Sequence, residues 1–252
     1  MFDLTGKVGL VTGGNGGIGL GFARGLAKAG ASVAIWGRNP DKNAAALAEL
    51  ESLGAEAATF ACDVGSEEQV TTAFAGTLDR FGHIDAVFAN AGIGTRGTRF
   101  VDTTLDEWRD IFRVNSEGVF LTLRSAARHM TERGEGGSLI LTASVSSVMG
   151  MPRGEHYAAT KSGAIAIARG LAVEFGKAGI RANAVVPGWI ETEMTDGVLD
   201  SQGFNERVLP RIPRRRWGRP SDFEGIAVYL ASDASEWHTG DVITIDGGYT
   251  VF

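Results

Sequence analysis

Residues 8–19 read VGLVTGGNGGIG. The apolar run Val8–Thr12 ends in a turn with five glycines in seven residues, which enters a helix-periodic segment, Ile18–Ala29. Glycine lets a ligand approach the backbone closely, and the free N–H groups at a helix start attract phosphate. The stretch therefore predicts a strand–turn–helix unit that binds a dinucleotide. The alternative is a tight turn that serves packing alone.

The same alternation of strand-like and helix-like segments continues along the chain. The expected strands are Val8–Thr12, Ser32–Trp36, Ala57–Ala61, Ala86–Ala89, Ser138–Thr142, Arg181–Val186 and Val242–Ile245. The expected helices are Ile18–Ala29, Pro40–Leu53, Glu67–Phe81, Thr104–Met130, Tyr157–Phe175 and Pro220–Ala231. Nearly all strand residues are apolar, as expected when both sheet faces are covered. The pattern predicts a doubly wound α/β fold with a parallel sheet, in one domain of residues 1–252.

One segment, residues 189–218, lacks sustained periodicity. Irregular insertions of this length in a compact domain are usually functional lids or disordered. Because the segment follows an expected strand end, where open α/β sheets bind ligands, it is predicted to be a lid over the substrate. The alternative is a surface excursion without a role.

The composition limits the classes of function. The chain has 252 residues, a formal net charge of −6 and a single cysteine, Cys62. The acidic balance argues against binding nucleic acid, and the single cysteine fits a reducing compartment. No apolar run approaches the roughly 20 residues of a membrane span, and the first residues do not resemble a signal peptide. We therefore expect a cytoplasmic protein with neither nucleic-acid nor membrane partners.

The second expected strand ends at Trp36-Gly-Arg-Asn-Pro40. An acidic residue in this region typically binds the ribose hydroxyls of NAD, whereas an arginine suits the 2′-phosphate of NADP. Arg38 therefore favours NADP(H) over NAD(H). The alternative is a solvated arginine ahead of a helix N-cap at Asn39.

The motif Tyr157-Ala-Ala-Thr-Lys161 begins a strongly helical segment, and its four-residue spacing puts both side chains on one face. A nearby ammonium favours the phenolate and is expected to lower the pKa of Tyr157 toward the useful range for acid–base catalysis. Ser144 follows the fifth expected strand and is placed to hydrogen-bond the same substrate oxygen. Ser146, in the same loop, is an alternative. No metal-ligand spacing is present in the sequence, so no metal is expected.

Together these motifs resemble the short-chain dehydrogenase/reductase family, including members similar to 3-oxoacyl-acyl-carrier-protein reductases. The resemblance spans nearly the whole chain. Its motifs are TGGNGGIG at 12–19, Asp63-Val64, Asn90-Ala-Gly92, Asn115, Ser144, Tyr157-x-x-x-Lys161, Pro187-Gly188 and Asp246-Gly-Gly248. It implies a seven-stranded sheet, an enzyme that oxidises or reduces at a CH–OH group, and a homotetramer or homodimer.

The resemblance also implies roles for individual residues. Tyr157 is expected to be the acid/base, Ser144 to orient the substrate oxygen, Lys161 to hold the nicotinamide ribose, and Asn115 to help hold a relay water. The alternative for Asn115 is a cap of a local helix kink. The expected cofactor-binding residues are Gly13, Asn15, Gly16, Gly17, Ile18, Gly19, Arg38, Asp63, Val64, Asn90, Ala91, Gly92, Thr142, Tyr157, Lys161, Pro187, Gly188, Ile190 and Thr192.

The substrate stays open at this stage. A 3-oxoacyl thioester competes with sugars, polyols and small ketones. A carrier-protein partner calls for a basic docking patch, and the only candidate is the arginine-rich run at 207–219, which also fits a lid or a subunit contact. Met149, Met151, Trp189 and Met194 are candidates for an apolar substrate pocket. A regulatory dinucleotide sensor without activity is a further alternative, since a fold alone does not settle function.

Overall fold

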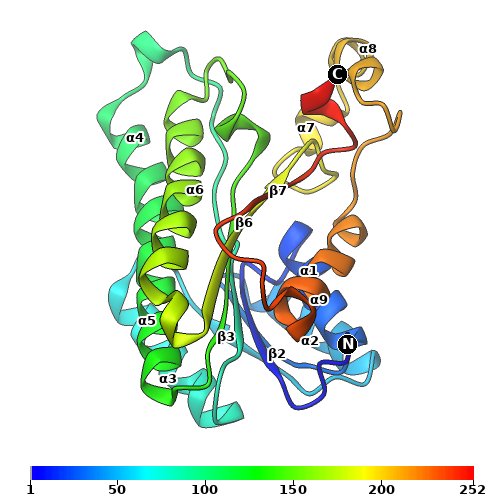
Figure 1. Cartoon of the computed structure of the whole chain (residues 1–252). Helices are drawn as coiled ribbons and strands as arrows, with labels where there is room; N and C mark the ends of the chain where they lie inside the picture. The colour runs from blue at the N-terminus through cyan, green and yellow to red at the C-terminus, as the bar shows by residue number, and fades with distance from the viewer. Residues whose placement is uncertain (1) are drawn as a thin grey trace.

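Seven parallel strands form one sheet in the computed structural model, which describes residues 2–252 (Figure 1). They follow the order β3-β2-β1-β4-β5-β6-β7, so the winding reverses between β1 and β4. The strands are β1 Val8–Thr12, β2 Ser32–Gly37, β3 Ala57–Ala61, β4 Ala86–Ala89, β5 Gly137–Thr142, β6 Ile180–Pro187 and β7 Val242–Ile245. The predicted doubly wound, seven-stranded sheet is confirmed.

Helices cover both faces of this sheet (Figure 1). One face carries α1 Gly17–Lys28, α2 Pro40–Ser52 and α9 Glu224–Ala231, the last preceded by a 3₁₀ turn at Pro220–Phe223. The other carries α3 Glu67–Phe81, α4 Leu105–Phe112, α5 Gly118–Arg133 and α6 Glu155–Phe175. No helix within residues 2–252 has the length and apolar composition to cross a membrane.

Strand alternation divides the core into two halves. Leu10 and Val87 belong to the cluster under α3, α5 and α6, whereas their neighbours Val11 and Phe88 belong to the cluster under α1 and α9. Successive strand residues point to opposite faces, so a strand covered on both faces must be apolar throughout. The prediction of full burial holds for the central strands only. The edge strands β3 and β7 are partly exposed, because each has a single neighbouring strand.

The single helix predicted at Thr104–Met130 is wrong in one respect. It is interrupted between α4 and α5 by a π-helical turn, Arg113–Glu117, which contains Asn115. The Asn115 side chain bonds the backbone of Ile93 instead of facing solvent, and an inserted residue of this kind is a known cause of a π-bulge. The pattern of hydrophobic residues does not show whether one turn of a helix is α-helical or π-helical, so the interruption could not be predicted from it.

The segment 189–218 is a compact substructure. It holds two short helices, α7 Asp196–Leu199 and α8 Gln202–Val208, and an apolar cluster of its own around Trp217. Its two ends are joined by a bridge between Ile190 and Gly218. In Figure 1 this segment stands above α1, at the carboxyl-terminal edge of the sheet.

Candidate active site

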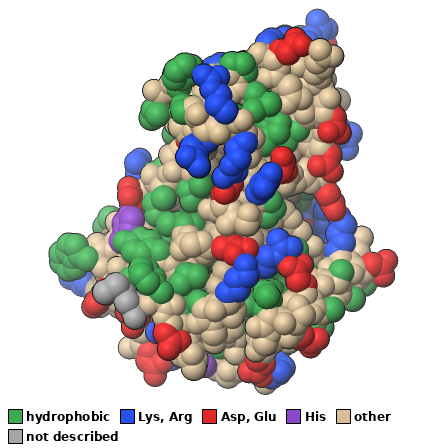
Figure 2. All heavy atoms as spheres, turned by 90° about the vertical axis from the view of Figure 1, so that its right-hand side faces the viewer, with side chains coloured by type: hydrophobic (Ala, Val, Ile, Leu, Met, Phe, Trp, Pro, Cys, Tyr) green, Lys and Arg blue, Asp and Glu red, His purple; other side chains and the backbone are tan. Residues whose placement is uncertain are grey.

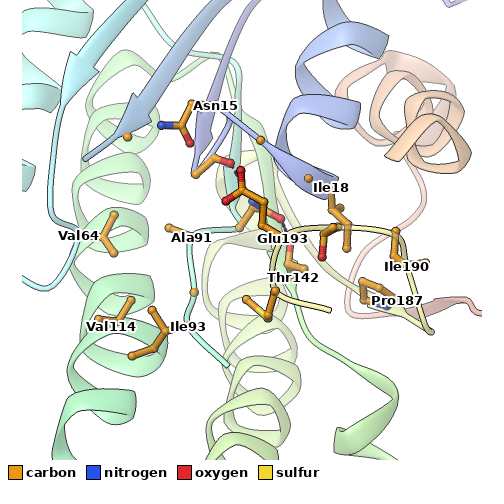
Figure 3. Close-up of a pocket in the computed structure, with 18 of the residues that line it drawn as sticks. Asn15, Ile18, Val64, Ala91, Ile93, Val114, Thr142, Pro187, Ile190 and Glu193 are labelled. Carbon is orange, nitrogen blue, oxygen red and sulfur yellow. Dashed lines mark hydrogen bonds between the residues drawn. The ribbon is translucent and has the colours of Figure 1, made fainter. Parts of the chain in front are cut away.

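A pocket of about 370 Å³ lies at the carboxyl ends of the strands, where the winding of the sheet reverses (Figure 3). Open α/β sheets bind their ligands in this crevice. Its walls come from the segments that follow β1 to β6. Of the residues predicted to bind the cofactor or to act in catalysis, all line this pocket except Gly19 and Asn115.

The glycine-rich turn forms one wall of the pocket. Gly13 and Gly17 adopt positive φ values of 64° and 51°, which side-chain-bearing residues rarely adopt. No side chain caps the start of α1, so its first N–H groups are available to an anion. These features fit the pyrophosphate of a dinucleotide. Gly19 serves packing instead, because a Cβ there would lie 2.3 Å from the Gly13 carbonyl oxygen.

The end of β2 forms the adjoining part of the pocket. Arg38 is exposed and lines it, and no ion pair to Arg38 is found among residues 2–252. A Cβ on Gly37 would lie 2.2 Å from Asn15 Nδ2, so glycine is needed for the turn to approach β2 this closely. Asn15 Nδ2 also donates to Asn43 Oδ1 at 2.6 Å, which ties the turn to α2. A free guanidinium at this position fits a 2′-phosphate.

Asp63 and Val64 follow β3 and line the same end. Burial raises the pKa of the Asp63 carboxyl, but the Gly65 N–H and Arg113 donate to it, and the net pKa lies below its usual range. Asp63 is therefore a stable carboxylate acceptor near neutral pH.

The residues after β4 connect three strands beneath the pocket. Asn90 Nδ2 donates to the Thr12 carbonyl oxygen at 3.1 Å, and Thr142 Oγ1 donates to Asn90 Oδ1 at 3.1 Å. Ala91 and Gly92 continue the pocket wall. This network fixes β1, β4 and β5 relative to one another at the floor of the site.

Ser144, Tyr157 and Lys161 converge on the other half of the pocket. Lys161 Nζ is buried, donates to the Thr142 carbonyl oxygen at 2.8 Å and lies 5.7 Å from the centre of the Tyr157 ring. Burial lowers the pKa of Lys161 to about 8. The predicted three-residue set is thus brought together by the loop after β5 and the first turns of α6.

Lys161 was expected to lower the pKa of Tyr157, and this expectation is wrong for the protein without its cofactor. Burial raises the Tyr157 pKa, and only a hydrogen bond with Ser144 acts in the lowering direction. The physical reason is that the Lys161 ammonium sits over the face of the ring and bonds a backbone carbonyl, so it does not contact the phenol oxygen.

Asn115 lies behind the pocket and does not line it. It is buried, its Oδ1 accepts the Ile93 N–H at 2.8 Å, and its Nδ2 donates to the Ile93 carbonyl oxygen at 3.0 Å. A Cβ on Gly92 would lie 3.1 Å from Asn115 Oδ1 and 3.4 Å from Lys161 Nζ, so both side chains flank Gly92. The structure therefore places Asn115 close to Lys161, as expected, within a kinked helix, as the alternative held.

The side of the pocket at the end of β6 is lined by Pro187, the last residue of that strand, and by Gly188, Ile190 and Thr192, which follow it (Figure 3). Of the four candidates for an apolar substrate pocket, Met194 alone lines the pocket, while Met149 and Trp189 pack against the apolar cluster around Trp217.

Several pocket-lining residues were not predicted. They are Trp36, Gly37, Lys42, Cys62, Ile93, Val114, Ala143, Glu193 and Thr195. Glu193 and Thr195 adjoin the predicted residue Met194, and Lys42 follows Arg38 by four positions, so proximity in sequence was an available signal. The sequence gives no such signal for Trp36, Cys62 and Val114, because apolar residues in these segments are predicted to lie in the core.

The fold and this pocket define a dinucleotide-binding oxidoreductase, and comparisons with known proteins agree. Residues 13–250 match the family model described as enoyl-(acyl carrier protein) reductase. The chain is 38% identical to 2,5-dichloro-2,5-cyclohexadiene-1,4-diol dehydrogenase of Sphingobium indicum, over 99% of both chains. It is 36% identical to the 3-oxoacyl-[acyl-carrier-protein] reductase of Chlamydia pneumoniae, over 98% of both.

The chain is similar to a solved structure at a comparable level of sequence identity. The gluconate 5-dehydrogenase of Burkholderia cenocepacia J2315, in complex with NADP and tartrate, has a TM-score of 0.94 and 37% identity, covering 100% of this chain and 98% of that one. The chain belongs to the short-chain dehydrogenase/reductase family. It is an oxidoreductase that interconverts an alcohol and a carbonyl group with a nicotinamide cofactor.

Proposed function

We propose that this enzyme prefers NADP(H) and that Ser144, Tyr157, Lys161 and Asn115 carry its reaction. The cofactor preference rests on Arg38, a guanidinium that lines the pocket at the end of β2, where an acidic residue would favour NAD. The similar gluconate 5-dehydrogenase structure contains NADP, which supports the same choice.

Tyr157 transfers the proton at the reacting oxygen, and Ser144 hydrogen-bonds that oxygen and orients it. The residues that line the pocket would hold a nicotinamide cofactor, which would supply or accept the hydride and, in its oxidised form, add a positive charge that favours the phenolate. Ser144 acts in the same direction on the Tyr157 pKa. Burial of the phenol raises the Tyr157 pKa, which suits proton donation in the reductive direction.

Lys161 positions the cofactor ribose and passes protons toward solvent. With a pKa of about 8, its ammonium can lose a proton near neutral pH far more readily than an exposed lysine. The Thr142 carbonyl fixes its Nζ, and Asn115 holds the backbone of Ile93 beside it. We propose that Asn115 helps to hold the relay water beside Lys161.

We propose a small polar secondary alcohol or its ketone as substrate, of the sugar-acid or polyol class, in preference to a carrier-bound acyl thioester. Four of the five arginines in residues 211–219 are engaged within the chain. Arg211 lies over the Tyr249 ring, Arg215 donates to the Pro210 carbonyl, Arg216 pairs with Asp222, and Arg219 pairs with Glu191. On the upper part of Figure 2 basic side chains gather beside apolar ones, with acidic side chains at their border. A docking surface for an acidic carrier protein requires basic groups that are free to pair with it, whereas most of these arginines are engaged within the chain.

Steady-state kinetics with NADPH and NADH test both parts of the proposal, using a panel of ketoses, keto sugar acids, cyclic ketones and acetoacetyl thioesters. We expect NADPH to be preferred at least tenfold and a polyhydroxylated ketone to be the best substrate. A preference for NADH contradicts the role of Arg38, and a preference for the thioester contradicts the substrate class.

The variant Tyr157→Phe tests the catalytic assignment. We expect turnover to fall by at least a thousandfold while NADPH binding, followed by its fluorescence, changes less than threefold, because only the phenol oxygen is removed. Turnover that survives in this variant rules out Tyr157 as the acid/base.

We further propose a homotetramer or homodimer in the cytoplasm. The family supports such an assembly, and several large apolar side chains are exposed, including Trp237 at 98%, Val173 and Phe252. The single cysteine is consistent with a reducing compartment. Light scattering coupled to size exclusion should give two or four times the mass of one chain, and a monomer would contradict the proposal.

A further inference from the structure

An ion pair crosses the mouth of the pocket at the end where Arg38 lies. Lys42, in the first turn of α2, pairs through its Nζ with the carboxylate of Glu193, in the segment that begins the lid. Both residues line the pocket. The contact therefore joins the cofactor side of the molecule to the lid across the opening.

The segment that carries Glu193 lies across the pocket. A Cβ on Gly17 would be 3.1 Å from Thr192 Cγ2, and a Cβ on Gly94 would be 3.1 Å from Met194 Cγ. Residues 192–194 thus reach from the glycine-rich turn to the loop after β4. In Figure 3 the Glu193 side chain extends from this segment toward the side of the pocket where Asn15 lies. A carboxylate is held beside the turn where phosphates are expected.

We propose that Lys42 is a ligand of the cofactor 2′-phosphate, and that Glu193 is an internal carboxylate that competes with this phosphate for Lys42. This inference rests on the proposed preference for NADP(H). When the phosphate arrives, Lys42 exchanges its partner, and Glu193 loses its tether to α2. An adenosine without a 2′-phosphate has no anionic group that could replace Glu193 as the partner of Lys42. The ion pair between Lys42 and Glu193 then remains.

The exposure of the pair makes such an exchange favourable. The side chains of Lys42 and Glu193 are 42% and 74% exposed, and ion pairs this open to solvent are weak. A phosphate monoester carries about −1.5 to −2 charges at neutral pH and accepts hydrogen bonds with three oxygens, whereas the carboxylate carries one charge. Lys42 therefore binds the phosphate in preference to the carboxylate. The apparent affinity for the phosphate is lowered by the fraction of molecules in which Lys42 is paired with Glu193.

Arg38 and Lys42 would then differ in their contributions. Arg38, which forms no ion pair within residues 2–252 but lies within electrostatic range of the Asp63 carboxylate, would bind the phosphate without first breaking a contact. Lys42 would add affinity only after Glu193 is displaced. Removal of the Glu193 charge should strengthen binding of phosphorylated ligands, and this gain should require Lys42.

Isothermal titration with 2′,5′-ADP and 5′-AMP tests the exchange without turnover. The variants are Glu193→Gln, Lys42→Met and the double variant. Glu191→Gln is the matched control, since Glu191 lies two residues away on the same segment, pairs with Arg219 at 3.5 Å and does not line the pocket. Thermal melting confirms that each variant is folded.

We expect Glu193→Gln to tighten 2′,5′-ADP binding about three- to fivefold, as an exposed pair allows, and to change 5′-AMP binding less than twofold. Lys42→Met should weaken 2′,5′-ADP about tenfold, which is the loss of one charge-assisted contact. In the Lys42→Met background the Glu193→Gln gain should vanish. Equal gains for both probes, a gain that persists without Lys42, or the same gain in Glu191→Gln each overturn the exchange.

The two proposals fail in different ways. If the wild-type enzyme prefers NADH while the Lys42-dependent gain for 2′,5′-ADP is present, the cofactor preference is wrong and the exchange stands. If NADPH is preferred but Glu193→Gln has no effect on 2′,5′-ADP, the exchange is wrong and the proposed preference for NADP(H) stands.

Discussion

Replacement of the buried lysine, Lys161→Met, should abolish activity and yet stabilise the fold at pH 7. Methionine fills a similar volume without a charge. In the native protein burial lowers the pKa of Lys161 from 10.5 to about 8. At about 1.4 kcal/mol for each pH unit, this corresponds to about 3 kcal/mol by which the fold disfavours the charged ammonium. Functional sites commonly carry such a cost.

Part of this gain is lost in the variant. The Thr142 carbonyl oxygen, 2.8 Å from Nζ, loses its donor, at a cost of about 1 kcal/mol. The net expectation is a variant more stable by about 2 kcal/mol at pH 7. Urea unfolding followed by circular dichroism measures it, and in a protein of this size the melting temperature should rise by about 4–8 °C.

The pH dependence has a defined sign. Below pH 8 the lysine is protonated in both the folded and the unfolded wild-type protein, and the full cost applies. Between pH 8 and 10.5 the folded protein releases this proton while the unfolded chain keeps it, so wild-type stability rises relative to the variant. The advantage of Lys161→Met should therefore shrink from pH 7 to pH 10. A variant less stable than wild type at pH 7, or an advantage independent of pH, refutes the reasoning.

Two further predictions concern the core. Burial raises the pKa of the Cys62 thiol to about 12, so the folded protein should resist iodoacetamide at pH 8 over hours. Mass spectrometry should show labelling of Cys62 only in urea. Rapid labelling of the folded protein would count against a buried, protonated thiol. Gly21→Ala should destabilise by about 3 kcal/mol or more, because a Cβ there would lie 2.1 Å from the Pro220 carbonyl oxygen. The matched control Gly163→Ala, in α6 with no atom within 4 Å of the added Cβ, should be neutral or stabilising by up to about 1 kcal/mol. A loss in Gly163→Ala as large as that in Gly21→Ala would contradict the contact as the cause, because helix propensity favours alanine at both positions.

Much of the fold could be predicted because its determinants are local. A strand buried on both faces is apolar at every position, and a helix that covers it is apolar on one face, so alternation of the two is visible in the sequence. The Tyr157–Lys161 spacing places both side chains on one helix face for the same reason. Strands fell within one residue of their expected ends, since turn residues mark them.

The interruption at Asn115 and the role of Gly19 could not be predicted this way. Asn115 departs from the regular helix because its amide bonds the backbone of Ile93, 22 residues earlier in sequence. Gly19 belongs to the glycine motif, but its neighbour is the Gly13 carbonyl and not the pocket. In both cases the deciding contact depends on a close approach of backbone segments.

The amino-acid sequence by itself determined the sheet, the crevice at the winding reversal and the residues that meet there, because periodicity and turn chemistry act over a few residues. Only the tertiary structure decided the electrostatic state of those residues. Lys161 bonds the Thr142 carbonyl and does not contact the Tyr157 phenol oxygen, so the Tyr157 pKa rises with burial and does not fall. The pairing of Lys42 with Glu193 joins residues 151 positions apart. Desolvation and long-range ion pairs depend on the whole packed chain, and no local pattern encodes them.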